Sequence, residues 1–534
     1  MSNSTQAIKV NPLQSLAEDF SREKIGFIIA VSCLVLLDGV NGAVCPTLPR
    51  YLNGSLAVTT DQVAWAAIFY YVGKLYMLVM SAKLQSIWGQ RRSFLTVSTA
   101  LVVLTATGML VPNYACLLLV LLLQGAAGGA MTALGQGTLL MLFPRREQPL
   151  VQGAYLLAAL MFPVTVVPEV LGGCAYNFDW RNVYLCMLPF GLLGCAWLFW
   201  KQKMLSDSVG SSPLLPIRLV LMLTALFAIV YVLEQGSRNR WLEYPPIVWA
   251  ILLALTCVAA IAFLETRGGA TLLSYESFHY ANFTFVMCVV ILAGIAFFGG
   301  GFVISGYAIN VLAYPVSTSG LVQLSGMAFS VVSFLSIGVL LRFTKINPAF
   351  YVLTGMLLFG ISMWQLGLAP SNLNFEGFAS WLTLRGFALG CQFLPLTLLA
   401  LTCLPGKDNV AAAGLFNFNR QIGVLIGIAW LQTLHEDLTD RNQTIFGNAL
   451  SSRNPNTMMY AQKIQDGLAL HGIPTSQIPS ESMALTVQEA NRQWANIAYN
   501  GCFECLAVMF LVAFPLIALA RILTTRFLKP PVCQ

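Results

Sequence analysis

Long apolar stretches recur from one end of this chain to the other. Fourteen stretches of the 534-residue sequence are long enough to cross a bilayer as α-helices, because about 20 residues span about 30 Å of hydrocarbon. Lipid offers no partner to an unpaired backbone N–H or C=O group, so segments of this kind must be helical. The repeated pattern therefore predicts an all-α polytopic membrane protein and excludes a soluble domain.

The predicted spans are distributed over the whole chain. They are residues 25–48, 62–82, 94–112, 116–143, 150–174, 182–200, 217–234, 246–264, 283–309, 320–341, 349–369, 379–404, 411–434 and 497–520. The residues before the first span are mostly polar and lack the apolar core and cleavage site of a signal peptide, so we expect an uncleaved tail. Charged residues make up only 10% of the chain, which agrees with a protein that lies mostly in lipid.

Basic residues are distributed unequally between the two sides of these spans. If the N-terminus lies inside, 18 of the 29 Lys and Arg residues fall in cytoplasmic segments and eight in outer segments, four of the eight in one long loop. Cytoplasmic loops of membrane proteins carry an excess of Lys and Arg. We therefore expect both termini in the cytoplasm, and we attribute the net charge of +7 to topology rather than to nucleic-acid binding.

Two long loops divide the chain: the stretch 201–216 is expected to be a cytoplasmic linker after a first set of six spans, and a long outer loop precedes the last span. The expected units are a cytoplasmic tail at 1–24, a six-helix bundle at 25–200, a linker with two extra spans at 201–282, a second bundle at 283–521 and a tail at 522–534. The long outer loop 435–496 alternates turn residues with helical patterns at 458–470 and 482–495. This alternation predicts a small extracytoplasmic helical hairpin, with a flexible connector as the alternative.

Several short motifs give the chain a family likeness. They are the basic turn Gly89, Gln90, Arg91 and Arg92 after span two, the small-residue run 124–130 in span four, residues 168–173 and 179–181 around the end of span five, the turn 233–236 after span seven and residues 419–423 in span thirteen. Together these motifs resemble the major facilitator superfamily, and in particular its fourteen-span drug:proton antiporters. The chain departs from that family at Leu121, where an arginine is usual, and at Pro168–Glu169, where a Gly-Pro pair is usual.

The resemblance implies both a fold and a function. The fold would be the major facilitator fold, with two six-helix bundles and two extra central helices. The function would be multidrug efflux: proton-coupled export of small amphipathic compounds across the bacterial inner membrane by alternating access. A periplasmic membrane-fusion adaptor leading to an outer-membrane channel would contact the outer loop, and Gly89, Arg91 and Arg92 would clamp helix ends in one conformation. No cofactor, metal or nucleic acid is expected.

Charged side chains inside the spans are few, and each needs a reason, because a charge near the bilayer centre costs about 2.5 to 3.5 kcal/mol. Asp38 lies about 20 Å into span one, and Asn41 follows on the same helix face. The resemblance implies that Asp38 is functional, as the group for which protons and substrate compete. Lys74 lies at nearly the same depth in span two. We hypothesise that Lys74 replaces the missing arginine as the partner of Asp38; snorkelling, or lining a wet cavity, is the alternative.

Further residues at membrane depth complete the predicted binding set. The polar members are Gln124, Glu169, Arg385, Asn419 and Arg420, and the expected apolar cavity walls are Trp65, Phe69, Tyr70 and Phe418. For Arg420 the alternative is that it fixes a helix end. For the aromatic residues the alternative is ordinary helix packing.

Other functions remain open at this point. A dedicated exporter of a siderophore, fatty acid or other anionic metabolite would suit the cations Lys74, Arg385 and Arg420. A channel should lack a coupling carboxylate, and a membrane-embedded enzyme should show clustered His, Asp or Glu at a membrane face. The three histidines of this chain are scattered, so we expect no enzyme and assign no catalytic residue.

Overall fold

Helices dominate the part of the chain that the structure describes. The computed structural model describes residues 22–47, 52, 54, 57–163, 179–205, 216–267, 275–344, 346–402, 404, 409–447, 455–470 and 477–527. The regular elements in these ranges are α-helices with short 3₁₀ and π segments. The predicted all-α class is therefore confirmed.

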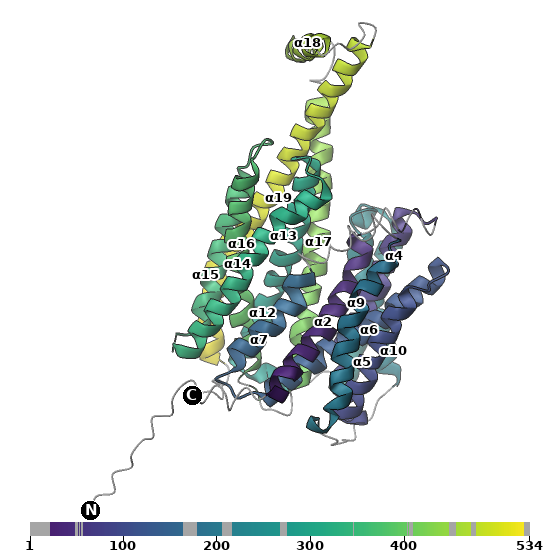
Figure 1. Ribbon diagram of the computed structural model, residues 1–534, viewed down its shortest axis with the longest axis vertical. Helices are drawn as coiled ribbons and strands as arrows, with labels where there is room; N and C mark the ends of the chain where they lie inside the picture. The colour runs from purple at the N-terminus through teal and green to yellow at the C-terminus, as the bar shows by residue number, and fades with distance from the viewer. Residues whose placement is uncertain are drawn as a thin grey trace, which may run out of the picture.

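The helices form two bundles that lie side by side, with two further helices against them (Figure 1). The first, the N-bundle, comprises α2 (Arg22–Thr47), α4 (Thr60–Trp88), α5 (Gln90–Gly108), α6 (Tyr114–Leu142), α7 (Gln148–Leu156) with the π segment η1 (Leu157–Met161), and α9 (Asn182–Trp200). The second, the C-bundle, comprises α12 (Ala281–Gly294), η5 (Ile295–Gly299), α13 (Gly300–Asn310), α14 (Val316–Phe343), α15 (Pro348–Gly367), α16 (Phe375–Leu401), α17 (Asn409–Gly447) and α19 (Ile478–Phe527). The remaining elements are α10 (Pro216–Gln235), α11 (Pro245–Thr266), α18 (Pro455–Leu470) and the 3₁₀ turns η2 (Gln202–Met204), η3 (Trp241–Glu243) and η4 (Tyr275–His279).

Eleven helical segments among the described residues are long and apolar enough to cross a membrane. The predicted count of fourteen is therefore not reproduced, although the described part of each predicted stretch lies mainly on a helix. The three predicted spans outside the eleven lie on α5, on α7 with η1, and on α17. The first turn of α5 is polar, the description of α7 stops at residue 163, and α17 carries Asn, Arg and Gln side chains within its apolar part.

Local sequence signals begin and end several of these helices. Thr59 caps α4 in a capping box with Gln62, and Asn113 caps α6 by accepting from the Cys116 backbone N–H, as short polar side chains do at helix starts. Gly89 separates α4 from α5 with φ 80°, a conformation that glycine adopts without strain. The predicted turn between spans two and three is thus a sharp break between consecutive helices.

The extra pair α10 and α11 lies against the N-bundle and reaches the C-bundle at one end. α10 packs on α4, whereas the apolar window of α11 is only 17% buried. At the end near α18, Trp241 Nε1 donates to Thr433 Oγ1 at 2.9 Å, and Ser237 donates to Glu436 at 2.9 Å. The turn between α10 and α11 therefore binds α17 of the C-bundle.

The two bundles meet through buried polar contacts at the end where α2 begins. Arg342 near the end of α14 pairs with Glu147 before α7, with an N–O distance of 2.7 Å and side chains that are 2% and 0% exposed. Deeper in the interface, Asn417 of α17 donates to Gln136 of α6. Gly414 of α17 lies against the backbone of Leu78 in α4. We call this region the closed end.

The opposite end carries a helical projection. α17 continues to Gly447 and α19 starts at Ile478, so both helices extend past the predicted spans, and α18 packs against α19 (Figure 1). The loop 435–496 was predicted to form a small helical hairpin. Its first helical pattern lies on α18, and its second is the first part of α19, because no breaker separates that pattern from the last apolar segment.

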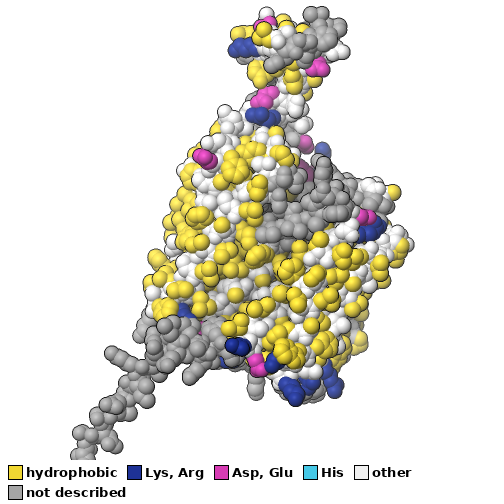
Figure 2. All heavy atoms as spheres, in the orientation of Figure 1, with side chains coloured by type: hydrophobic (Ala, Val, Ile, Leu, Met, Phe, Trp, Pro, Cys, Tyr) yellow, Lys and Arg dark blue, Asp and Glu magenta, His cyan; other side chains and the backbone are white. Residues whose placement is uncertain are grey.

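Hydrophobic side chains cover much of the helical body seen in Figure 2, and Lys and Arg side chains gather at the end away from the projection. Many large exposed side chains are apolar, including Leu255 of α11 at 61% and Leu193 of α9 at 67%. Such a surface suits contact with lipid rather than with water. The chain is thus a multi-pass membrane protein.

Candidate substrate and coupling site

Glycines in α6 let three helices of the N-bundle approach closely around Asp38. A Cβ added at Gly128 would overlap Asp38 Oδ1 of α2, and one added at Gly125 would overlap the Tyr70 carbonyl of α4. Gly129 lies in the same way against the Lys74 backbone. Small residues at such a seam allow backbones to touch. The predicted small-residue face therefore forms the floor of the Asp38 site.

The Asp38 carboxylate is buried and accepts hydrogen bonds at both oxygens. Its side chain is 2% exposed. Tyr70 Oη donates to Oδ1 at 2.6 Å, and Thr132 Oγ1 donates to Oδ2 at 3.3 Å. Lys74 Nζ lies 2.8 Å from Oδ2 and forms an ion pair with it. A buried carboxylate needs such partners, because desolvation of an unpaired charge is costly.

Lys74 therefore lies where the depth argument placed it, beside Asp38. Its side chain is 12% exposed, and its Nζ is 5.4 Å from the centroid of the Tyr70 ring. The ammonium does not snorkel, since it is bound at the middle of α4. Leu121, which stands at the position of the family arginine, is fully buried in an apolar cluster.

Tyr70 is not the apolar wall that the sequence suggested. It is 2% exposed, and its hydroxyl donates to the Asp38 side chain and also lies 2.8 Å from the Asp38 carbonyl. The prediction treated the tyrosine as a ring and overlooked the phenol. A buried phenol usually finds an acceptor, and here the acceptor is the carboxylate one helix away.

The other predicted polar residues of the N-bundle point to neighbouring helices. Asn41 donates to Thr105 Oγ1 of α5 at 2.9 Å, and Gln124 donates to the Leu104 carbonyl of α5 at 2.9 Å. Both contacts join helices inside the bundle. Glu169 lies outside the described residues.

Three predicted aromatic walls belong to a packing cluster with the extra helix α10. The Trp65 ring lies 5.3 Å from Tyr231 between centroids, and Phe69 lies 5.8 Å from Phe227 in an edge-on arrangement. Phe418 of α17 packs on the same cluster. These rings occupy the junction of α4, α10 and α17, and the packing alternative describes their contacts.

The C-bundle contributes two buried arginines. Arg385 of α16 donates to the Phe297 carbonyl within the π segment η5 at 2.8 Å; π segments of this kind frequently occur at functional sites. Arg420 of α17 is 5% exposed and lies close enough to Tyr155 and Asp38 to interact with them electrostatically. Its neighbour Asn419 turns away and donates to Met287 Sδ at 3.3 Å.

The basic turn after α4 joins helix ends within the N-bundle. Arg91 Nε and Nη2 donate to Gln202 Oε1 at 3.0 and 2.6 Å, which ties α5 to η2, the turn that follows α9. Gln90 donates to Thr138 of α6 at 2.9 Å. Arg92 is exposed. Of the two arginines expected to clamp helix ends, Arg91 makes such a contact, and Gly89 lies at the break between α4 and α5.

Two residues of the site were missed in the sequence. Thr132 donates to Asp38, and Tyr155 of α7 donates to the Thr132 carbonyl at 3.0 Å. The spacing held a signal for Thr132: it lies four residues after Gly128, so both share one face of α6. Tyr155 gave no comparable signal, since only the tertiary fold brings α7 to this position.

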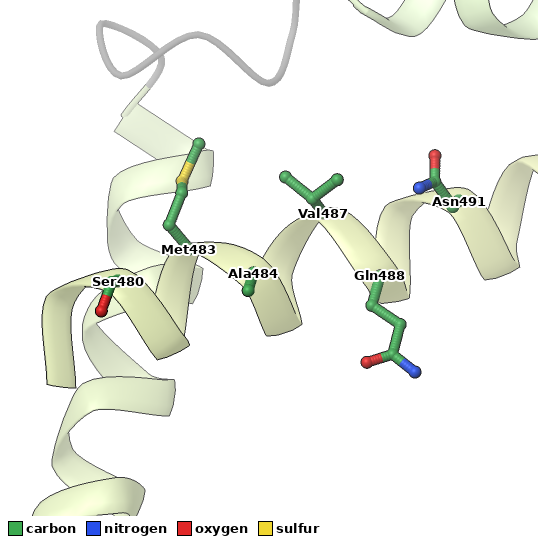
Figure 3. Close-up of a pocket in the computed structure, with 6 residues that line it drawn as sticks. All are labelled: Ser480, Met483, Ala484, Val487, Gln488 and Asn491. Carbon is green, nitrogen blue, oxygen red and sulfur yellow. The ribbon is translucent and has the colours of Figure 1, made fainter. Parts of the chain in front are cut away.

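A separate hollow lies on the projection, far from Asp38. Figure 3 shows its lining on one stretch of α19, formed by Ser480, Met483, Ala484, Val487, Gln488 and Asn491. These positions recur every three or four residues and so form one face of the helix. The face is mostly apolar at its centre and polar at its ends.

Two apolar helical bundles with a charge pair buried between helices define a membrane transport protein of the secondary type. Comparison with known proteins identifies the transporter family. The family model described as Major Facilitator Superfamily matches residues 30–428, and the chain belongs to that family.

Known relatives match most of the chain at low identity. The multidrug export protein EmrB of Haemophilus influenzae is 22% identical over 94% of this chain and 95% of its own length. The fatty acid resistance protein FarB of Neisseria gonorrhoeae is 21% identical over 92% and 95%. Among solved structures, the human organic anion transporter MFSD10 matches with a TM-score of 0.56 at 11% identity over 92% of this chain and 99% of that chain. The chain is thus a transporter related to these bacterial resistance exporters, with the fold of the family.

Proposed function

We propose that this protein exports small amphipathic compounds across the bacterial inner membrane in exchange for protons. The observation that carries the proposal is the buried ion pair between Asp38 and Lys74. A charged pair at this depth is costly, and charged residues that persist inside membrane spans usually mark functional sites. The relatedness to multidrug and fatty acid resistance exporters supports export as the direction of transport.

Coupling would follow from competition at Asp38. Protonation of the carboxylate removes the negative charge that holds Lys74, and the hydrogen bonds from Tyr70 and Thr132 must rearrange with it. The two protonation states therefore favour different arrangements around α2, α4 and α6. Substrate binding that prefers one arrangement would release or take up the proton, so the two fluxes would be linked.

The distribution of basic side chains supports cytoplasmic termini. Arg91, Arg146 and Lys201 lie at the same end of the described helices as the start of α2, and Figure 2 shows Lys and Arg gathered there. This orientation agrees with the excess of basic residues in cytoplasmic loops. The closed end would then face the cytoplasm, so the bundles would be closed toward the cytoplasm.

The projection supports a periplasmic partner. It would stand outside the membrane, and its hollow around Met483 and Val487 offers an apolar contact surface on one face of α19. We propose that a membrane-fusion adaptor contacts this face and connects the transporter to an outer-membrane channel.

The function is tested by proton movement in proteoliposomes that contain a pH-sensitive dye. Lipophilic cations and organic anions are offered to the wild type, Asp38→Asn, Lys74→Met and the double variant. Asp61→Asn is the control, because Asp61 is an exposed carboxylate at the start of α4. We expect substrate-driven proton release in the wild type and the control, and its loss in Asp38→Asn.

The double variant tests the pair as a unit. Loss of one partner strands a buried charge, whereas loss of both does not, so the double variant should be no worse than the poorer single variant. Additive losses would mean that the two residues act separately. Transport that ignores the pH gradient and survives Asp38→Asn would point to a facilitator instead.

A further inference from the structure

Arg420 brings an unpaired cation to the interface between the bundles. The side chain is 5% exposed, and its Nε and Nη1 have no hydrogen-bond partner among the described residues. A guanidinium carries five N–H donors and stays charged in proteins. Burial of such a group without an acceptor is costly, so the position indicates an acceptor that arrives with a ligand.

The nearby carboxylate does not supply that acceptor. Asp38 already accepts from Tyr70 at Oδ1 and from Lys74 at Oδ2, and the ion pair balances its charge. Tyr155, the other group near Arg420, is neutral and donates to the Thr132 carbonyl, so it cannot balance the charge of the guanidinium. The residues described around Arg420 therefore leave its charge uncompensated.

Charge at this depth is unequal within the described part of the chain. Lys74, Arg385 and Arg420 are cations, whereas Asp38 is the carboxylate near Lys74 and Arg420 and is engaged by Lys74. Arg385 has its own acceptor, the Phe297 carbonyl, but that acceptor is neutral. A cationic compound entering between the bundles would meet net repulsion, whereas an anionic one would meet attraction.

We propose that the substrate is an amphipathic organic anion whose carboxylate, or a similar planar oxyanion, is bound by the guanidinium of Arg420. This inference rests on the proposed export function and specifies the substrate class of that site. The planar fork of arginine matches a carboxylate with two parallel hydrogen bonds. The apolar part of the molecule would lie among the surrounding apolar spans.

The inference is tested by equilibrium binding in nanodiscs without a pH gradient. The probes are 1-naphthoate, 1-naphthylmethanol and 1-naphthylmethylammonium, which share one ring system and differ in the charge of the head group. Quenching of tryptophan fluorescence or calorimetry reports the affinity. We expect 1-naphthoate to bind at least about tenfold more tightly than the alcohol, as for one charge-assisted hydrogen bond, and the ammonium compound to bind least tightly.

Variants assign the preference to Arg420. Arg420→Gln should remove the advantage of 1-naphthoate over the alcohol, and Arg420→Lys should keep part of it, since the charge remains but the fork is lost. Without ligand, Arg420→Gln should melt at the wild-type temperature or above, because the guanidinium has no partner to lose. Arg521→Gln is the control; Arg521 lies near the end of α19, outside the proposed site, and donates to Asn282 Oδ1 at 2.6 Å, so this variant should melt lower and keep the head-group ranking.

Three results would overturn the inference. They are tighter binding of the ammonium compound than of 1-naphthoate, an unchanged 1-naphthoate preference in Arg420→Gln, and loss of the preference in Arg521→Gln alone. None of these results depends on coupling, because no proton gradient is present. Failure of the proposed antiport would instead appear as uncoupled transport with the head-group ranking intact.

Discussion

At the scale of single residues, the absence of a side chain at Gly128 determines what Asp38 can do. The carboxylate occupies the volume that a Cβ at Gly128 would fill, and this position brings it within reach of Thr132 on the same helix. A glycine in a helix costs about 1 kcal/mol of helix propensity relative to alanine. Here the glycine permits the contact between α2 and α6 on which the ion pair depends.

Gly128→Ala should therefore displace Asp38 and impair both stability and coupling. We expect about 1 to 3 kcal/mol of destabilisation, as for other overpacked interiors, seen as a lower melting temperature in nanodiscs, together with loss of substrate-driven proton release. Gly467→Ala in α18 is the control, because a Cβ there meets nothing within 4 Å. Equal melting temperatures and equal proton release in the two variants would contradict a role for the close contact at Gly128.

At the scale of elements, how much the sequence could predict depended on whether the signal was local. The long apolar stretches are local signals, and the described helices lie on them; the caps at Thr59 and Asn113 are local too, and they set where α4 and α6 begin. The pairing of Asp38 with Lys74 could be predicted, because the depth of each residue follows from counting residues along its span. The contact of Arg342 with Glu147 could not be anticipated, because it requires the relative placement of two bundles. The extent of α19 was also missed, because an amphipathic segment and an apolar one form a single helix without a break.

The projection leads to a test that separates partner contact from transport itself. Met483 lines the hollow and is 38% exposed, while Leu485 is 40% exposed and lies two residues on, about 200° around the helix. Met483→Glu should lower export from whole cells by about tenfold, as loss of a central interface residue does, and leave proteoliposome transport unchanged. Leu485→Glu, with the same change of charge, should affect neither. Equal losses in cells and proteoliposomes would place the effect within the transporter.

At the scale of the whole molecule, the two bundles are joined at the closed end by a buried ion pair. Arg342 and Glu147 are 2% and 0% exposed. Opening this end would return both charges to water. In the closed arrangement, their attraction offsets the lost hydration only while the two groups keep their close contact. Alternating access would require this contact to break in each cycle.

Arg342→Met should accordingly loosen the closed end. We expect hydrogen exchange at the last turn of α14 and the first turn of α7 to quicken by at least about tenfold, equivalent to about 1.4 kcal/mol. Lys201→Met is the control; it breaks the pair with Glu23 at the same end of the molecule, but the partners are 27% and 54% exposed, and such pairs contribute about 0 to 1 kcal/mol. Exchange that quickened equally in both variants would show that charge at this end matters more than the contact.

The continuity of α19 has a mechanical consequence. One helix of 50 residues runs from the projection to the far side of the C-bundle, a length of about 75 Å. A tilt of about 10° at its base would carry the tip through roughly 13 Å, estimated from that length. The projection therefore behaves as a lever arm: a molecule held at its tip would be displaced with every rocking movement of the bundle.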